Sequence, residues 1–165
     1  MDKNHKLLFH GAKSRIEGKL DIHKSRTNND LGQGFYTGER YEQAISFISG
    51  FEKSSVYIFD FKEEGLKGKK YNVNQEWMMT IAYYRGALEE YENHPIIKKL
   101  IEKSCDCDYI IAPIADNRMF QIINSFIMGE ITDEQCKHCL AATNLGYQYV
   151  FKSDKAIKSL KMLER

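Results

Sequence analysis

The pattern of apolar and polar positions predicts short strands separated by helices. Runs of apolar, β-branched or aromatic residues predict strands over 6–11, 35–37, 55–61, 108–115 and 147–152. Apolar positions that recur every three or four residues predict helices over 39–51, 74–90, 95–103 and 117–128. Within the first of these helices, the pattern assigns to the core Ala44, Ile45, Phe47, Ile48 and Phe51.

Capping residues predict where several helices begin. Asn72 or Asn74 is suited to cap the helix over 74–90. Thr132, followed three residues later by Gln135, is a capping box that opens another helix. Ser153 is expected to cap a terminal amphipathic helix. The residues expected to face inward on that helix are Ile157, Leu160 and Leu163.

The order of these elements favours an α+β fold in one domain. Strands and helices alternate irregularly, and the strands are short, which fits packed sheets better than a doubly wound one. The 165 residues contain no repeat, low-complexity tract or linker. We therefore expect residues 1–165 to form a single domain with a two-layer core.

Charge and hydropathy argue against a polyanion-binding protein and against a membrane-spanning protein. The 24 basic and 23 acidic residues give a formal net charge of +1, so no strong polyanion-binding surface is predicted. No apolar run approaches the ~20 residues that cross a bilayer, and the N-terminus has no signal-like segment. We expect a cytoplasmic protein without membrane contact.

The cysteines permit two interpretations. The sequence contains Cys-x-Cys and then Cys-x-x-Cys, which is a conceivable zinc set formed by Cys105, Cys107, Cys136 and Cys139. However, the second pair falls in a helical pattern, whereas structural zinc usually takes this spacing from a tight knuckle. The favoured interpretation is reduced thiols and no metal.

Three stretches carry the candidate chemistry. The glycine-rich stretch 32–38 reads Gly-Gln-Gly-Phe-Tyr-Thr-Gly, and its glycines allow a tight turn and a close backbone approach. Upstream, an apolar strand ends in His10-Gly11. Near the C-terminus, 147–151 reads Tyr-Gln-Tyr-Val-Phe.

In this combination and order, the chain resembles the ADP-ribosyltransferase superfamily. The resemblance is to the His-Tyr-Glu branch that includes the poly(ADP-ribose) polymerases. It is closer to a bacterial domain family of unknown function, with the pattern Leu-Tyr-His-Gly-Ser, then Asp-Phe-Gly-Lys-Gly-Phe-Tyr-Leu-Thr, then a late Gln. The matching stretches here are 8–11, 30–37, 111–120 and 148–151.

The resemblance implies a fold and an activity. The implied fold has two small packed β-sheets, a central cleft that holds NAD, and flanking helices. The implied activity is NAD-dependent mono-ADP-ribosyl transfer, with NAD as co-substrate and an unknown protein or nucleic acid as acceptor. A bacterial toxin or defence effector with a cognate antitoxin protein is the setting that this resemblance suggests.

The resemblance also implies a role for each site residue. His10 would orient the ribose through a hydroxyl, Gly11 would pair its backbone with the carboxamide, and Tyr36 would stack on the pyridine ring. The predicted cofactor-binding set is His10, Gly11, Lys13, Arg26, Gly34 and Tyr36.

The polar connection from Lys13 to Asn29 has two interpretations. It carries four cations, which are Lys13, Arg15, Lys24 and Arg26. They are either solvated charges of an exposed loop or neutralise the dinucleotide pyrophosphate, for which the planar arginine group is well suited.

Gln148 is the third catalytic candidate, with His10 and Tyr36, and it departs from the polymerase pattern. An amide can accept a hydrogen bond from the ribose, but it brings no negative charge to an oxocarbenium-like centre. Chain growth is therefore disfavoured, and single transfer remains open. Glu39 is a spare carboxylate, although a glutamate at a helix start also stabilises the helix dipole. The alternative function is a catalytically weak binder of NAD or ADP-ribose that acts through a protein partner.

Overall fold

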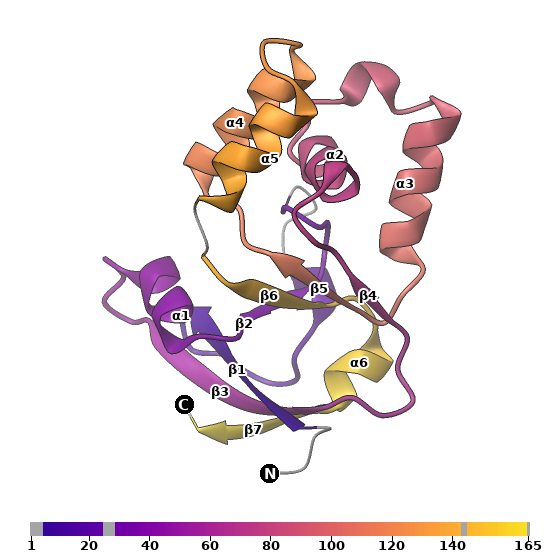
Figure 1. Cartoon of the computed structure of the whole chain (residues 1–165). Coiled ribbons are helices and arrows are strands. Elements are labelled where there is room, and N and C mark those ends of the chain that lie inside the picture. The colour runs from indigo at the N-terminus through magenta and orange to yellow at the C-terminus, as the bar shows by residue number, and fades with distance from the viewer. Residues whose placement is uncertain (1–4, 25–28, 143–144, 165) are drawn as a thin grey trace.

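The computed structural model describes residues 5–24, 29–142 and 145–164, and within them a mixed sheet is flanked by helices (Figure 1). The strands are β1 (His5–Ala12), β2 (Phe35–Gly38), β3 (Ser55–Lys62), β4 (Gly68–Lys70), β5 (Tyr109–Pro113), β6 (Tyr147–Phe151) and β7 (Leu160–Glu164). The helices are α1 (Tyr41–Ile48), α2 (Gln75–Tyr84), α3 (Pro95–Cys105), α4 (Asn117–Ile127), α5 (Asp133–Ala141) and α6 (Asp154–Lys158). Two 3-10 turns cover Ile22–Lys24 and Glu89–Tyr91.

The α+β class is confirmed, but the prediction of two separate sheets is wrong. The strands form one seven-stranded sheet in the order β4-β5-β6-β2-β1-β3-β7. Its pairs are antiparallel, except that β4 runs parallel to β5. The short strand β2 joins the halves, because it pairs with β6 over four residues and with β1 through Phe9 and Gly38.

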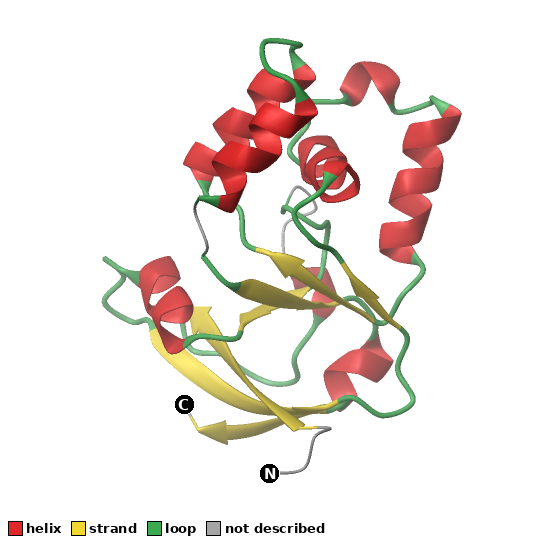
Figure 2. Ribbon diagram, viewed as in Figure 1, coloured by secondary structure: helices red, strands yellow, loops and turns green. Residues whose placement is uncertain are grey.

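The hydrophobic core consists of two clusters on opposite faces of the sheet. Helices α2, α4 and α5 gather above β5 and β6, as Figure 2 shows, and enclose a core that includes Trp77, Ile81, Ile110 and Val150. A second core lies among β1, β3, β6 and α6, and it includes Leu8 and Phe59. Strands β5 and β6 contribute to both clusters, since Ile110 and Val150 belong to the first and Tyr109 and Phe151 to the second.

Local capping signals are confirmed. Of the two candidates for the α2 cap, Asn74 is the one used, and it accepts the backbone N–H of Trp77 at 3.0 Å. Thr132 and Gln135 form the expected capping box of α5. The Ser153 hydroxyl caps α6 by accepting the backbone N–H of Ala156 at 3.1 Å.

Three predicted helices differ in length from those in the structure. Helix α1 covers only Tyr41–Ile48 of the predicted 39–51. Helix α2 ends at Tyr84, because the chain turns at Gly86, whose φ of 87° is a conformation that favours glycine. The predicted terminal helix stops at Lys158 and is followed by β7, which pairs with the edge of β3.

The C-terminal strand β7 also changes which of the residues expected to face inward are buried. Ile157 and Leu160 are half-buried against the second core, but Leu163 is 51% exposed. Strand β4 is a second element that the apolar pattern did not predict, since its sequence is Gly-Lys-Lys. Both strands exist because a neighbouring edge supplies hydrogen-bond partners, which is not a local property of the sequence.

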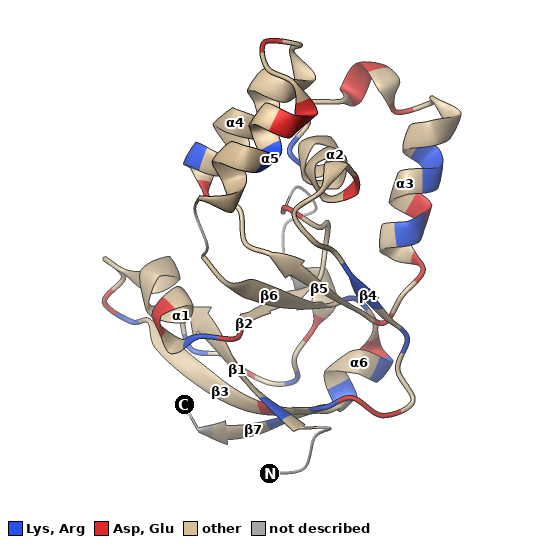
Figure 3. Ribbon diagram, in the orientation of Figure 1, with Lys and Arg blue, Asp and Glu red and all other residues tan. Residues whose placement is uncertain are grey.

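Basic and acidic residues are interspersed over the described part of the chain, as Figure 3 shows. This agrees with the balanced composition, although the short strand β4 carries two lysines and no carboxylate. None of the described helices has the length and apolar character needed to cross a membrane.

Candidate functional site

The strands that carry the three sequence motifs lie side by side. The motif order leads to the expectation that these strands converge with His10, Tyr36 and Gln148 along one cleft. Strands β1, β2 and β6 are consecutive in the sheet, but of the three residues only His10 lines the described pocket. Across these strands, Phe9, Gly38 and Gln148 stand opposite one another in a single row. His10 and Tyr36 are also joined directly, because Nδ1 of His10 lies 2.6 Å from the carbonyl oxygen of Tyr36.

His10 is held in a defined state. Its ring stacks on Phe35, with centroids 4.3 Å apart and planes inclined by 26°. Burial lowers the pKa of His10, although the bond to the Tyr36 carbonyl acts in the opposite direction. A neutral imidazole that faces a carbonyl oxygen donates from Nδ1, which leaves Nε2 as an acceptor. That nitrogen can accept a hydroxyl proton, as the predicted contact with a ribose requires.

Tyr36 fastens the glycine-rich turn. Its hydroxyl donates to the carbonyl oxygen of Gly32 at 2.6 Å and accepts the backbone N–H of Leu31 at 3.0 Å. The ring is half-buried against the helical core, and burial raises the pKa of the Tyr36 hydroxyl. Tyr36 thus shapes the turn that precedes β2, and its ring is not among the described residues that line the pocket.

Gln148 is buried, with 8% of its surface exposed. Its side-chain amide donates to the carbonyl oxygen of Pro113 at 3.3 Å. By register, Gln148 shares a sheet face with Phe9 and Gly38, whereas His10 stands opposite Tyr57 on the alternate face of β1. The Gln148 amide is thus bonded to the backbone, and it lies outside the described lining of the pocket at the end of β1.

The glycines at the site allow close packing. A side chain at Gly11 would collide with the Ala44 carbonyl oxygen and lie 2.9 Å from Cγ2 of Ile48, so Gly11 lets α1 lie against β1. A Cβ at Gly34 would lie 2.8 Å from Cγ1 of Val150. The space beside Gly34 is therefore filled by β6, which gives this predicted cofactor residue a packing role.

Two cations outside the sequence motifs, Arg85 and Lys152, anchor the glycine-rich turn. Arg85 donates to Asp30 at 2.6 Å and to the carbonyl oxygen of Ala115 at 2.9 Å. Lys152 donates to the carbonyl oxygen of Leu31 at 2.6 Å. Arg85 was placed on an amphipathic helix and Lys152 at a strand end, and neither position gave a signal of this contact. They hold the turn through residues that are 55 and 121 positions away in sequence.

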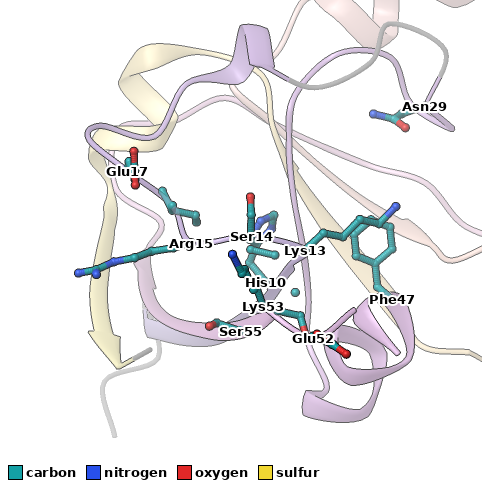
Figure 4. A pocket seen from close by; sticks show the side chains of 14 residues that line it. His10, Lys13, Ser14, Arg15, Glu17, Asn29, Phe47, Glu52, Lys53 and Ser55 are labelled. Atoms are coloured by element: carbon teal, nitrogen blue, oxygen red, sulfur yellow. The ribbon is translucent and has the colours of Figure 1, made fainter. Parts of the chain in front are cut away.

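An open pocket of about 1230 Å³ lies at the end of β1 (Figure 4). Its lining comes from 10–17, Asn29, Phe47 and 52–55. Of the predicted cofactor residues, it brings together His10, Gly11 and Lys13. Arg26 lies outside the described residues.

The pocket combines charge with one exposed aromatic ring. Its cations are Lys13, Arg15 and Lys53, and its carboxylates are Glu17 and Glu52. The prediction that Phe47 is core is wrong, since 58% of it is exposed. Ile45 and Phe51 are likewise 41% and 47% exposed. The apolar face of α1 is wider than the strip of the helix that β1 covers, so the residues at the edges of this face remain at the surface.

Glu39 has a structural role at the start of β6. It accepts the backbone N–H of Tyr147 at 3.1 Å and lies 3.7 Å from the ammonium of Lys6. Its carboxylate thus fixes the position of β6 beside β2 and has two partners already.

The four cysteines are free thiols. Cys136 is fully buried, with Sγ 3.2 Å from Sδ of Met78, whereas Cys139 is exposed. Within 5–24, 29–142 and 145–164, no three His, Cys, Asp or Glu side chains are placed to hold a metal ion.

Comparison with protein-family models assigns the chain to a family. No curated protein and no solved structure gives a significant match to the chain. A family model with the description "Protein of unknown function (DUF3990)" matches residues 7–162, which is nearly the whole chain. The chain therefore belongs to the DUF3990 family.

Proposed function

We propose that this protein is an NAD-dependent mono-ADP-ribosyltransferase. The observation that carries the proposal is the pocket at the end of β1, which His10 and Gly11 line and where burial favours the neutral imidazole of His10. The motif resemblance assigns ribose orientation and carboxamide pairing to these same two residues. Lys13, Arg15 and Lys53 supply positive charge that suits a pyrophosphate in the same space.

The proposed reaction is a substitution at the anomeric carbon of the nicotinamide ribose. The carbon–nitrogen bond breaks, and nicotinamide leaves with the electron pair as a neutral molecule. A nucleophilic oxygen or nitrogen of the acceptor forms the new bond to that carbon and loses its proton to solvent. The transition state resembles an oxocarbenium ion, so its stabilisation depends on oriented dipoles and negative charge around the sugar.

The second candidate function is a binding module for NAD or ADP-ribose. It is favoured by Gln148, which brings no charge and is bonded to the Pro113 carbonyl oxygen. A binder needs only the pocket, whereas a transferase needs stabilisation of the cationic sugar. The transferase would act as a bacterial toxin or defence effector with a cognate antitoxin protein, whereas the binding module would act through a protein partner.

One experiment separates the two functions. The purified protein is incubated with NAD labelled in the adenylate and with a cell lysate, and label is followed into protein, RNA and DNA while free nicotinamide is measured. Labelled macromolecules together with nicotinamide release support transfer. Thermal stabilisation by NAD without release supports the binding module. If neither NAD nor ADP-ribose stabilises the protein and NAD is not cleaved, both functions are excluded.

A further inference from the structure

Lys13 lies over two aromatic rings at the pocket. Its Nζ is 5.1 Å from the ring centroid of Phe47 and 4.8 Å from that of Phe51. Both rings are largely exposed, at 58% and 47%, and Lys13 is exposed as well. The ammonium therefore lies against the rings at a site where water is available to it.

The ring contacts are the interactions that hold Lys13. It makes no salt bridge with a described residue, although Glu17 and Glu52 line the same pocket. The faces of aromatic rings carry negative electrostatic potential and attract a cation within about 6 Å. The two rings that contact this one ammonium thus form a site that stabilises a cation, and the site lies beside the pocket that His10 lines.

We propose that Phe47 and Phe51 form a binding site for a flat nitrogen cation, which Lys13 occupies in the free protein and a pyridinium ring occupies in the complex. The identity of the natural ligand rests on the proposed function: the ring of oxidised NAD is a pyridinium cation, whereas the ring of NADH is neutral. The site would then prefer the oxidised dinucleotide. Cleavage turns the bound cation into neutral nicotinamide, which weakens the ring contact and favours product release.

Two small molecules test the site without the reaction. 1-Methylnicotinamide carries the cationic ring, and nicotinamide is its neutral counterpart with the same carboxamide. Their affinities are measured by NMR titration of the full chain. A cation–π contact at an exposed site contributes about 0.5–1 kcal/mol, so the cation is expected to bind about two- to fivefold more tightly. The double variant Phe47→Leu with Phe51→Leu keeps apolar side chains without a π face, and it should remove that preference.

Two lysine variants test the occupancy by Lys13. Lys13→Met frees the rings, so 1-methylnicotinamide should bind it about two- to fivefold more tightly than wild type. Lys53→Met is the matched control, because it removes the same charge from the same pocket without uncovering either ring. The gain in this control should be smaller.

Each contrary outcome overturns the proposal. These outcomes are equal affinity for the two probes, a preference that survives replacement of both Phe47 and Phe51 by Leu, equal gains in the two lysine variants, and no binding of either probe in the tens of millimolar. Neither probe contains a bond to ADP-ribose, so this test and the labelled-NAD experiment fail independently.

Discussion

The imidazole of His10 and the backbone of Tyr36 are joined across the junction of the two sheet halves. Nδ1 of His10 donates to the Tyr36 carbonyl oxygen at 2.6 Å, next to the one residue pair, Phe9 and Gly38, that links β1 to β2. The same contact sets the tautomer of His10 and ties the strand that ends in the pocket to the strand that follows the glycine-rich turn. A change in His10 should therefore affect both stability and ligand binding.

The lowered pKa of His10 predicts how stability depends on pH. In the unfolded chain this histidine takes up a proton near pH 6.5, but in the folded protein it does so only at lower pH. Its contribution is complete above pH 6.5 and is lost as the pH falls through the folded-state pKa. Denaturation of wild type and His10→Gln between pH 8 and 5 should show an acid-side loss that is larger in wild type.

The exposed side chain of His23 provides the control for removing an imidazole. His23→Gln should follow the wild-type dependence on pH. A loss of stability toward acid that is the same in wild type and His10→Gln would show that His10 is not the buried neutral group inferred from its contacts.

Substitutions of Gln148 test the departure from the polymerase pattern. An ionised glutamate cannot donate to the Pro113 carbonyl oxygen, so Gln148→Glu should lose about 1–3 kcal/mol of stability. Gln148 lies on the sheet face opposite to His10 and outside the described pocket lining, so the new anion acts on the sugar only if NAD binding brings this side chain to it. In that case NAD hydrolysis should rise roughly 30- to 1000-fold, equivalent to about 2–4 kcal/mol. Burial of the new carboxyl should raise its pKa, so the gain should be largest on the alkaline side.

Gln148→Ala provides the opposite change, because it removes the orienting amide and should reduce transfer. Nicotinamide release and acceptor labelling are measured for wild type and both variants, with circular dichroism to verify folding. If an active wild type is unaffected by either change, Gln148 takes no part in the reaction. The pocket carboxylates Glu17 and Glu52 then become the candidates.

The ion pair between Arg85 and Asp30 should stabilise the glycine-rich turn. Both side chains are less than a fifth exposed, so Arg85→Met leaves a carboxylate that is poorly solvated and unpaired. We expect a loss of about 2–4 kcal/mol in chemical denaturation, and a smaller additional loss when Asp30→Asn is combined with it. The control is Lys69→Met in the more exposed pair with Glu76, which should cost less than about 1 kcal/mol. Additive losses for Arg85 and Asp30 would contradict the coupling.

Gly34→Ala distinguishes a packing role from a ligand contact. The added methyl would lie 2.8 Å from Cγ1 of Val150 and 2.9 Å from the Phe151 carbonyl oxygen, so β2 or β6 must shift. A loss of about 1–3 kcal/mol is expected in urea denaturation, with the NAD-induced rise in Tm retained in the folded fraction. Unchanged stability together with loss of that rise would return Gly34 to the predicted cofactor set.

The sequence by itself determined the local structure and part of the site. The Thr132–Gln135 capping box, the Asn74 cap and the strands that carry the motifs all follow from interactions between residues close in the chain. The same holds for His10, Gly11 and Lys13, which are consecutive or nearly so and therefore reach one pocket together.

Tertiary structure alone decided what depends on distant partners. The helical pattern shows which residues of α1 are apolar. It does not show that β1 covers only part of this apolar face, which leaves Phe47 exposed at the pocket. The edge of β3 turns the chain after Lys158 into a strand, because its unpaired backbone groups gain partners there. Arg85 reaches Asp30 only when α2 packs beside the turn. Such contacts depend on how whole elements pack together, which a local pattern does not encode.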